Sequence, residues 1–107
     1  MTTRSRPPIH PGVTLYEDVM KELNLSANQV AMILGVPANR ISEIVRGRRS
    51  ITADTALRLA EWLGTSPEFW MRLQEKYDLE LTRMQAGDDI RRQVTQRLDL
   101  ASVASGK

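Results

Sequence analysis

The sequence predicts an all-α protein whose single domain contains five helices. Apolar residues recur every three or four positions over most of the chain, which is the spacing of one face of a helix. The predicted helices open on proline, serine or threonine, and most of them end at glycine or asparagine. A length of 107 residues suits one domain with a modest core and is too short for two. We expect the domain to span residues 9–86, between a flexible tail at 1–8 and an extension at 87–107.

The first helix is expected to begin at His10 and Pro11 and to end at Asn24. Proline is favoured at the first helical position because it lacks the amide that would have no partner there. The predicted buried face is a stripe at four-residue spacing: Leu15, Val19 and Leu23. Asn24 suits a left-handed terminator. His10 is expected to cap or pack the start of the helix.

Two short segments that meet at Gly35 form the centre of the chain. Ser26 and Gln29 match the S-x-x-Q pattern of a capping box, which starts a helix. Gly35 supplies the left-handed turn that ends it, and the next helix is expected from Pro37 to about Arg46. The positions where the two helices would cross fit the register of a helix-turn-helix over residues 26–46. These positions are Ala31, Gly35, Ile41 and Ile44.

The outward face of the second helix is polar, and a cluster of arginines follows it. Contact with base edges requires such a face, although a merely solvated helix would show the same polarity. Arginine suits bidentate contact with guanine and phosphate. The base-reading candidates are Ala38, Asn39, Arg40, Ser42, Glu43 and Arg46. The phosphate-binding candidates are Ser26, Ala27 and Asn28, at a helix N-terminus, together with Arg48 and Arg49.

Two further helices are expected to support this motif. The first is expected to be capped by Thr52 and to end at Gly64. The second is expected to start at Ser66, which a proline follows. The predicted buried face of the first is Ala53, Ala56, Leu57 and Ala60. The second carries a stripe of Trp70, Leu73, Tyr77, Leu81 and Met84. Gly87 breaks the pattern, and a short amphipathic helix is then expected from the spacing of Ile90, Val94 and Leu98.

The large apolar side chains of the predicted helix that starts at Ser66 exceed what so small a chain can easily bury. An aromatic stripe is more often core than a ligand site, but some of these residues are expected to be covered by a second subunit. The candidates for this dimer interface are Phe69, Trp70, Leu73 and Tyr77.

The composition argues against several classes of protein. There is no cysteine and one histidine, so disulfides and thiolate metal sites are excluded. No apolar run approaches the roughly 20 residues of a membrane span, and the N-terminus lacks a secretory signal, so a cytoplasmic location is expected. The net charge is only +2, but arginine supplies 12 of the 15 basic residues. No catalytic motif is present, and we expect no enzyme activity, cofactor, metal or small-molecule substrate.

Several blocks of the chain resemble the HigA-type antitoxins, a branch of the Xre/Cro-like helix-turn-helix repressors. They are IHPG (9–12), LSAN (25–28), GVP (35–37), NRISEI (39–44), GRR (47–49), ITADTALRLA (51–60) and LGTSPEFW (63–70), with further matches to residue 81. The resemblance covers about two-thirds of the chain. The helix-turn-helix blocks alone indicate a DNA-binding superfamily, whereas IHPG combined with ITADTALRLA and SPEFW is more specific.

The resemblance implies a five-helix, lambda-repressor-like domain that forms a homodimer on double-stranded operator DNA with an inverted repeat. It also implies repression of the protein's own toxin–antitoxin operon and neutralisation of a RelE-like, mRNA-cleaving toxin of the HigB type. The alternative is a stand-alone Xre-family transcriptional regulator without a toxin, because the DNA-reading half would look the same.

Overall fold

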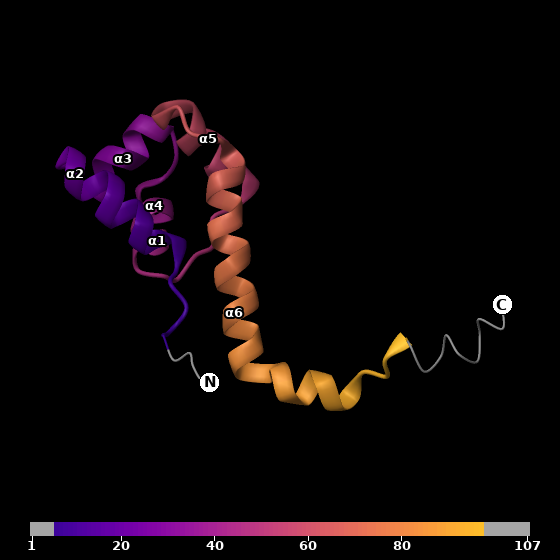
Figure 1. The fold of residues 1–107 in the computed structure, drawn as a ribbon. Helices are drawn as coiled ribbons and strands as arrows, with labels where there is room; N and C mark the ends of the chain where they lie inside the picture. Colours follow the sequence, from indigo (N-terminus) through magenta and orange to yellow (C-terminus); the bar gives the residue numbers. More distant parts are fainter. Residues whose placement is uncertain (1–5, 98–107) are drawn as a thin grey trace, which may run out of the picture.

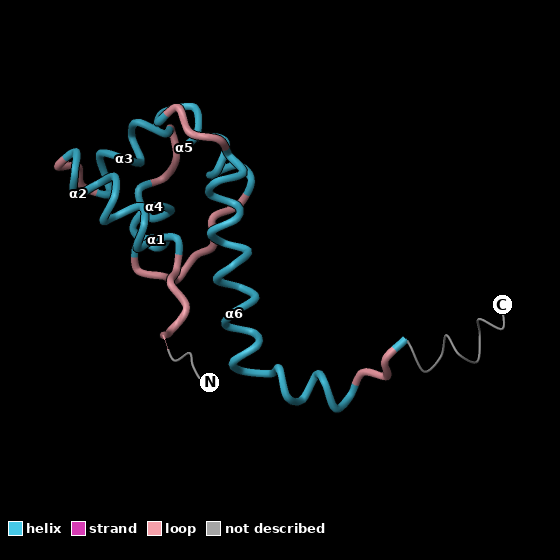
Figure 2. Tube along the Cα trace, in the orientation of Figure 1, coloured by secondary structure: helices cyan, strands magenta, loops and turns pink. Residues whose placement is uncertain are grey.

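The computed structural model describes residues 6–97, and this part of the chain consists of helices joined by turns, without a strand (Figure 2). The elements in chain order are α1 (Pro11–Thr14), η1 (Leu15–Met20), α2 (Lys21–Leu23), α3 (Ala27–Leu34), α4 (Ala38–Val45), α5 (Ala53–Leu63) and α6 (Pro67–Gln93). The first three join end to end as one helix, so the elements between Pro11 and Gln93 make five helices. The predicted all-α, five-helix fold is confirmed.

The middle of the first helix is wound as a π-helix. The Lys21 N–H donates to the carbonyl of Tyr16, five residues earlier, instead of four. Leu15 and Met20, also five apart, are consequently both buried, whereas Leu23 is 51% exposed. The predicted four-residue stripe was therefore wrong at Leu23, because the wider turn shifts the buried face. Asn24 ends the helix at φ 56°, as predicted.

The core lies where α3, α4, α5 and the first half of α6 meet the first helix (Figure 1). Its largest fully buried side chains are Trp70, Leu15, Ile41, Ile44, Ile51 and Leu59. Burial of each side chain of this size contributes roughly 1.5–3 kcal/mol. The indole N–H of Trp70 donates to the Thr65 hydroxyl at 3.2 Å, so the buried ring keeps its polar atom paired.

Helix α5 begins after Thr52 and ends at Gly64, as predicted. Its buried face is Thr55, Ala56, Leu59 and Ala60. Leu57 is 59% exposed and Ala53 is also exposed, so neither belongs to that face, contrary to our expectation. The reason is geometric: each residue advances about 100° around a helix, so the four buried residues share one side of α5 and Leu57 lies outside that side.

Helix α6 continues through the predicted break at Gly87 and ends at Gln93. A glycine costs a helix interior only about 1 kcal/mol relative to alanine, so it need not end a helix. The pairs Asp88–Arg91 and Asp89–Arg92, each three residues apart, lie on this continuing turn. The expected domain boundary at residue 86 thus falls inside one helix. Leu98, part of the predicted short helix, lies outside the described residues.

The two halves of α6 have different surroundings. The first half packs against α5 and α1, while the second half extends away from the body and changes direction (Figure 1). Ile90 is 44% and Val94 61% exposed in this extension. None of the helices in residues 6–97 combines the length and apolar character needed to cross a membrane.

Candidate nucleic-acid interface

Helices α3 and α4 are joined by a tight turn at Gly35. The glycine has φ 72°, a left-handed conformation that L side chains disfavour. Val36 N–H donates to the Ala31 carbonyl at 3.0 Å, which closes the end of α3 in the manner of a Schellman motif. Ala31 and Ile41 are buried between the two helices. The predicted helix-turn-helix is therefore present in the expected register.

The C-terminal end of α4 rests directly on the first helix. A Cβ added to Gly12 would lie 1.9 Å from the Ile44 carbonyl oxygen and 3.0 Å from the Val45 Cα. Only glycine allows the two backbones to approach so closely. This contact holds one side of α4 against the core and leaves the other side facing outward.

The outward side of α4 is polar. Ile41 and Ile44 are fully buried, and the opposite side of the helix carries the exposed Asn39 and Arg46. Ala38 is exposed at the start of the helix, and Ser42 and Glu43 are half-buried along it. The structure thus brings together, on or beside one face, every predicted base-reading residue except Arg40.

Arg40 lies on the flank of α4 and points toward α5. Its Nη1 donates to Asp54 Oδ2 at 2.5 Å, and its side chain is 26% exposed. The same carboxylate oxygen accepts from Arg58 Nε at 2.9 Å. These hydrogen bonds, from Arg58 first and then Arg40, hold the pKa of Asp54 below its usual range. Arg40 is held in this flanking position because the first turn of α5 supplies an acidic partner.

The N-terminus of α3 carries the predicted capping box. Ser26 Oγ accepts from Gln29 N at 3.2 Å, and Gln29 Oε1 accepts from Ser26 N at 2.8 Å. The box thus uses two of the amides at this helix end. The amides of Ala27 and Asn28, in the first turn, remain available for a phosphate.

The arginine loop, residues 46–49, turns back toward α4. Gly47 has φ 77°, and Arg48 N–H donates to the Glu43 carbonyl at 2.8 Å. Arg49 donates to Glu43 Oε1 from Nε at 2.9 Å and from Nη2 at 2.7 Å. A base-reading candidate and a phosphate candidate are therefore paired with each other in the free protein. Arg48 is exposed.

Two residues that the sequence did not single out as site residues anchor this loop and the chain directly after it. Gln74 is 5% exposed; its Oε1 accepts from Ile51 N at 2.7 Å and its Nε2 donates to Asp78 Oδ1 at 2.9 Å. His10 caps the first helix, accepting from Gly12 N at 2.8 Å through Nδ1, and contacts the Arg49 backbone through a hydrogen bond. Burial lowers the pKa of His10, against the opposing effects of that bond and the Asp78 charge.

The predicted dimer-interface residues do not share one exposed surface. Trp70 is 1% exposed and belongs to the core of its own chain, so it has no surface left for a second subunit. Leu73 and Tyr77 are half-buried, and the Tyr77 ring packs edge-on against His10 at a centroid distance of 4.8 Å. Phe69 is 42% exposed. Phe69 is thus the most accessible of the four.

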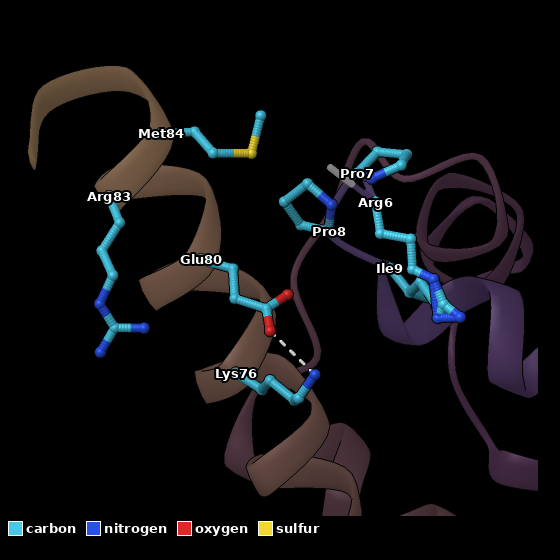
Figure 3. A pocket seen from close by; sticks show the side chains of 8 residues that line it. All are labelled: Arg6, Pro7, Pro8, Ile9, Lys76, Glu80, Arg83 and Met84. Atoms are coloured by element: carbon cyan, nitrogen blue, oxygen red, sulfur yellow. Dashed lines mark hydrogen bonds and ion pairs between the residues drawn. The ribbon is translucent and has the colours of Figure 1, made fainter. Parts of the chain in front are cut away.

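A shallow groove of about 440 Å³ lies between the chain before α1 and the middle of α6 (Figure 3). Residues 6–9 form one wall, so the described end of the predicted tail lies beside α6. Met84 and Glu80 face Pro8 across the groove (Figure 3). Glu80 is paired with Lys76 at 2.8 Å.

Comparison with known proteins agrees with this geometry. Residues 17–70 match the family model described as helix-turn-helix. Virulence-associated protein I of Dichelobacter nodosus is 48% identical over 75 residues, which cover 70% of this chain and 69% of that protein. An addiction module antidote protein of the HigA family from Coxiella burnetii has 48% identity and a TM-score of 0.81, over 85% of this chain and 99% of that one. The structure of Pseudomonas aeruginosa antitoxin HigA with higBA promoter has 38% identity and a TM-score of 0.80, over 82% of this chain and 96% of that one. The chain belongs to the Xre-like helix-turn-helix family of DNA-binding proteins, within its branch of HigA-type antitoxins.

Proposed function

We propose that this chain is the antitoxin of a two-gene addiction module, which represses its own operon and neutralises a RelE-like, mRNA-cleaving toxin of the HigB type. The observation that carries the proposal is the uncovered polar face of α4, held outward by the buried Ile41 and Ile44. The similarity to an antitoxin HigA solved with higBA promoter supports DNA as the partner of that face.

In this proposal α4 enters the major groove and its exposed side chains read base edges. Asn39 is suited to a bidentate contact with adenine, and Arg46 to guanine or a phosphate. Glu43 can accept from cytosine once Arg49 releases it. Exchange of the Glu43–Arg49 pair for DNA contacts costs little, because exposed ion pairs contribute only about 0–1 kcal/mol.

Phosphate contacts would fix the position of α4 without reading sequence. The free amides of Ala27 and Asn28 lie at the positive end of the α3 dipole, which favours an anion. Arg48 and Arg49 lie on the loop after α4, which His10 contacts, and Gln74 anchors the chain just beyond it at Ile51. Two protomers, arranged as a homodimer, would present two such surfaces to an inverted repeat.

The test is a binding titration of the purified protein on the DNA upstream of its own gene, with a scrambled duplex as the comparison. Asn39→Ala should weaken binding to the upstream DNA by about 1–3 kcal/mol if the amide contacts a base, and should leave scrambled DNA unaffected. Gln85→Ala, which removes an exposed amide from α6, is the matched control and should change neither. Equal losses on both duplexes for Asn39→Ala would remove this residue from the base-reading set.

The toxin half of the proposal needs a separate measurement. Co-expression with the neighbouring short reading frame should relieve the growth arrest that this frame causes alone, and the two proteins should co-purify. Selective DNA binding without a toxic neighbour would instead identify a stand-alone transcriptional regulator. Absence of selective binding by the folded protein would contradict autorepression.

A further inference from the structure

The carboxylate of Asp54 connects three helices of the DNA-facing part of the molecule. Its Oδ2 accepts from Arg40 Nη1 on α4 at 2.5 Å and from Arg58 Nε on α5 at 2.9 Å. Arg58 Nη1 in turn donates to the Leu34 carbonyl, at the end of α3, at 2.8 Å. We call Asp54, Arg40 and Arg58 the Asp54 clamp.

The position of Asp54 favours its ionised form and restrains its movement. It lies in the first turn of α5, where the helix dipole stabilises a negative charge. Arg58 stands four residues later on the same helix, so the pair can form without distorting the backbone. Since Arg58 is itself anchored to α3, the carboxylate is held in a fixed place beside Arg40.

Arg40 Nη1 is turned toward α5, where it donates to Asp54 and, at 3.5 Å, to the Thr55 hydroxyl, so the side chain is directed away from the polar face of α4. A guanidinium that contacts phosphate strengthens binding to any DNA sequence, because it releases counterions without reading bases. One held by a carboxylate makes no such contribution. The clamp therefore affects how strongly the protein binds DNA that is not its operator.

We propose that Asp54 is a positioning residue that withholds Arg40 from DNA and so keeps the affinity for unrelated sequences low. This inference rests on the proposed DNA-binding function of the α4 face. It goes beyond that function because neither Asp54 nor Arg58 contacts DNA in it. It also assigns Arg40 a different role from the neighbouring polar residues of α4.

The test uses full-length protein carrying Asp54→Asn, Arg40→Ala or both, on the upstream and scrambled duplexes at several salt concentrations. Asp54→Asn should bind scrambled DNA about fivefold more tightly at 0.1 M salt, with a salt slope steeper by about 0.9, as one added phosphate contact predicts. Arg40→Ala alone should change binding to either duplex less than about twofold, because Arg40 makes no contact to lose. The double variant should return to the wild-type affinity for scrambled DNA.

Asp88→Asn is the matched control, because it also removes one exposed acid paired with an arginine, but far along α6. Thermal unfolding followed by circular dichroism confirms that each variant is folded before binding is measured. A gain by Asp54→Asn no larger than that of Asp88→Asn overturns the inference. So does a gain that persists in the double variant, since simple charge repulsion by Asp54 would then explain it.

Two further results would also overturn the inference. One is weaker binding of folded Asp54→Asn to both duplexes, which would mean that the clamp organises the contact surface. The other is a selective loss on the upstream DNA for Arg40→Ala, which would make Arg40 a base-reading residue. Failure of the proposed function is distinguishable, because it would appear as a wild-type protein that does not discriminate between the duplexes.

Discussion

The single histidine links three parts of the molecule through a neutral imidazole. His10 accepts from Gly12 N at the start of the first helix, contacts the Arg49 backbone, and packs against Tyr77 of α6. The acceptor at Nδ1 is lost when the ring is protonated, because both nitrogens then carry hydrogens. Protonation therefore weakens the helix start, whereas the hydrogen bond to the Arg49 backbone favours the protonated ring and is kept.

This arrangement predicts that the free energy of unfolding falls as the pH is lowered. Burial lowers the pKa of His10 in the folded protein below the usual value of about 6.5 that the unfolded chain would have. The unfolded state then binds more protons, so the stabilisation is present above pH 6.5 and is lost as the pH falls through the folded pKa. Urea unfolding between pH 5 and 8 should show a falling free energy of unfolding on the acid side.

His10→Asn is the matched control for this prediction. Asparagine can accept from the same amide but does not titrate, so the variant should keep the helix start and lose the pH dependence near 6.5. Because the chain has no other histidine, no second imidazole can produce that dependence. An unchanged pH profile in His10→Asn would exclude His10 as its cause.

At the residue scale, the sequence predicted the identity of polar surface residues better than their partners. Ser26 with Gln29 and Thr52 form the expected caps, because capping depends on residues a few positions apart. Arg40 and Gln74 were not predictable in this way. Their partners, Asp54 and Ile51, are 14 and 23 residues away and become neighbours only after the helices pack.

At the scale of elements, the contact between the first helix and α4 gives a sharp prediction. Gly12→Ala would place a methyl group 1.9 Å from the Ile44 carbonyl oxygen, inside a backbone contact that no side-chain rotation can relieve. Overpacking of this kind typically costs about 1–3 kcal/mol, and separation of two backbones belongs at the upper end. The free energy of unfolding should fall accordingly, as measured by urea titration.

Gly87→Ala is the control, because it makes the same substitution at a position with room for the added methyl group. Gly87 lies inside α6, and an added Cβ there would meet only side-chain atoms at 3.9 Å. This change should stabilise the protein by about 0.5–1 kcal/mol, because glycine is the poorer helix former. Similar effects of the two substitutions would show that the approach of the first helix to α4 is not tight in solution.

The helix boundaries were predictable where a terminating residue adopts a left-handed conformation. Asn24, Gly35 and Gly64 each do so at a helix end. Gly87 has no such conformation, and the same residue type there sits inside α6. The π turn of η1 was also missed, because i, i+4 and i, i+5 patterns overlap in a stretch where Leu15, Val19 and Met20 are all apolar.

At the scale of the whole molecule, one protomer can read only a short stretch of DNA. Helix α4 has eight residues and is therefore about 12 Å long, whereas one DNA turn is about 34 Å. In the proposed function, selective binding to an inverted repeat thus requires two copies of α4 at a fixed separation. Phe69 is exposed enough to lie between protomers, and the extended half of α6 offers further apolar surface.

A rigid dimer should consequently be sensitive to the spacing of its half-sites. Five additional base pairs at the centre of the inverted repeat rotate one half-site by about half a turn and should abolish high-affinity binding, since one DNA turn holds about 10 base pairs. Ten additional base pairs return both half-sites to the same side of the DNA but increase their separation by about 34 Å. A fixed pair of α4 helices cannot span that distance, so binding should remain weak. Gel-shift titrations on the three duplexes, with protein mass in solution from light scattering, measure both effects. Equal binding to all three would mean that monomers bind each half-site independently, and would count against a dimer with a fixed separation.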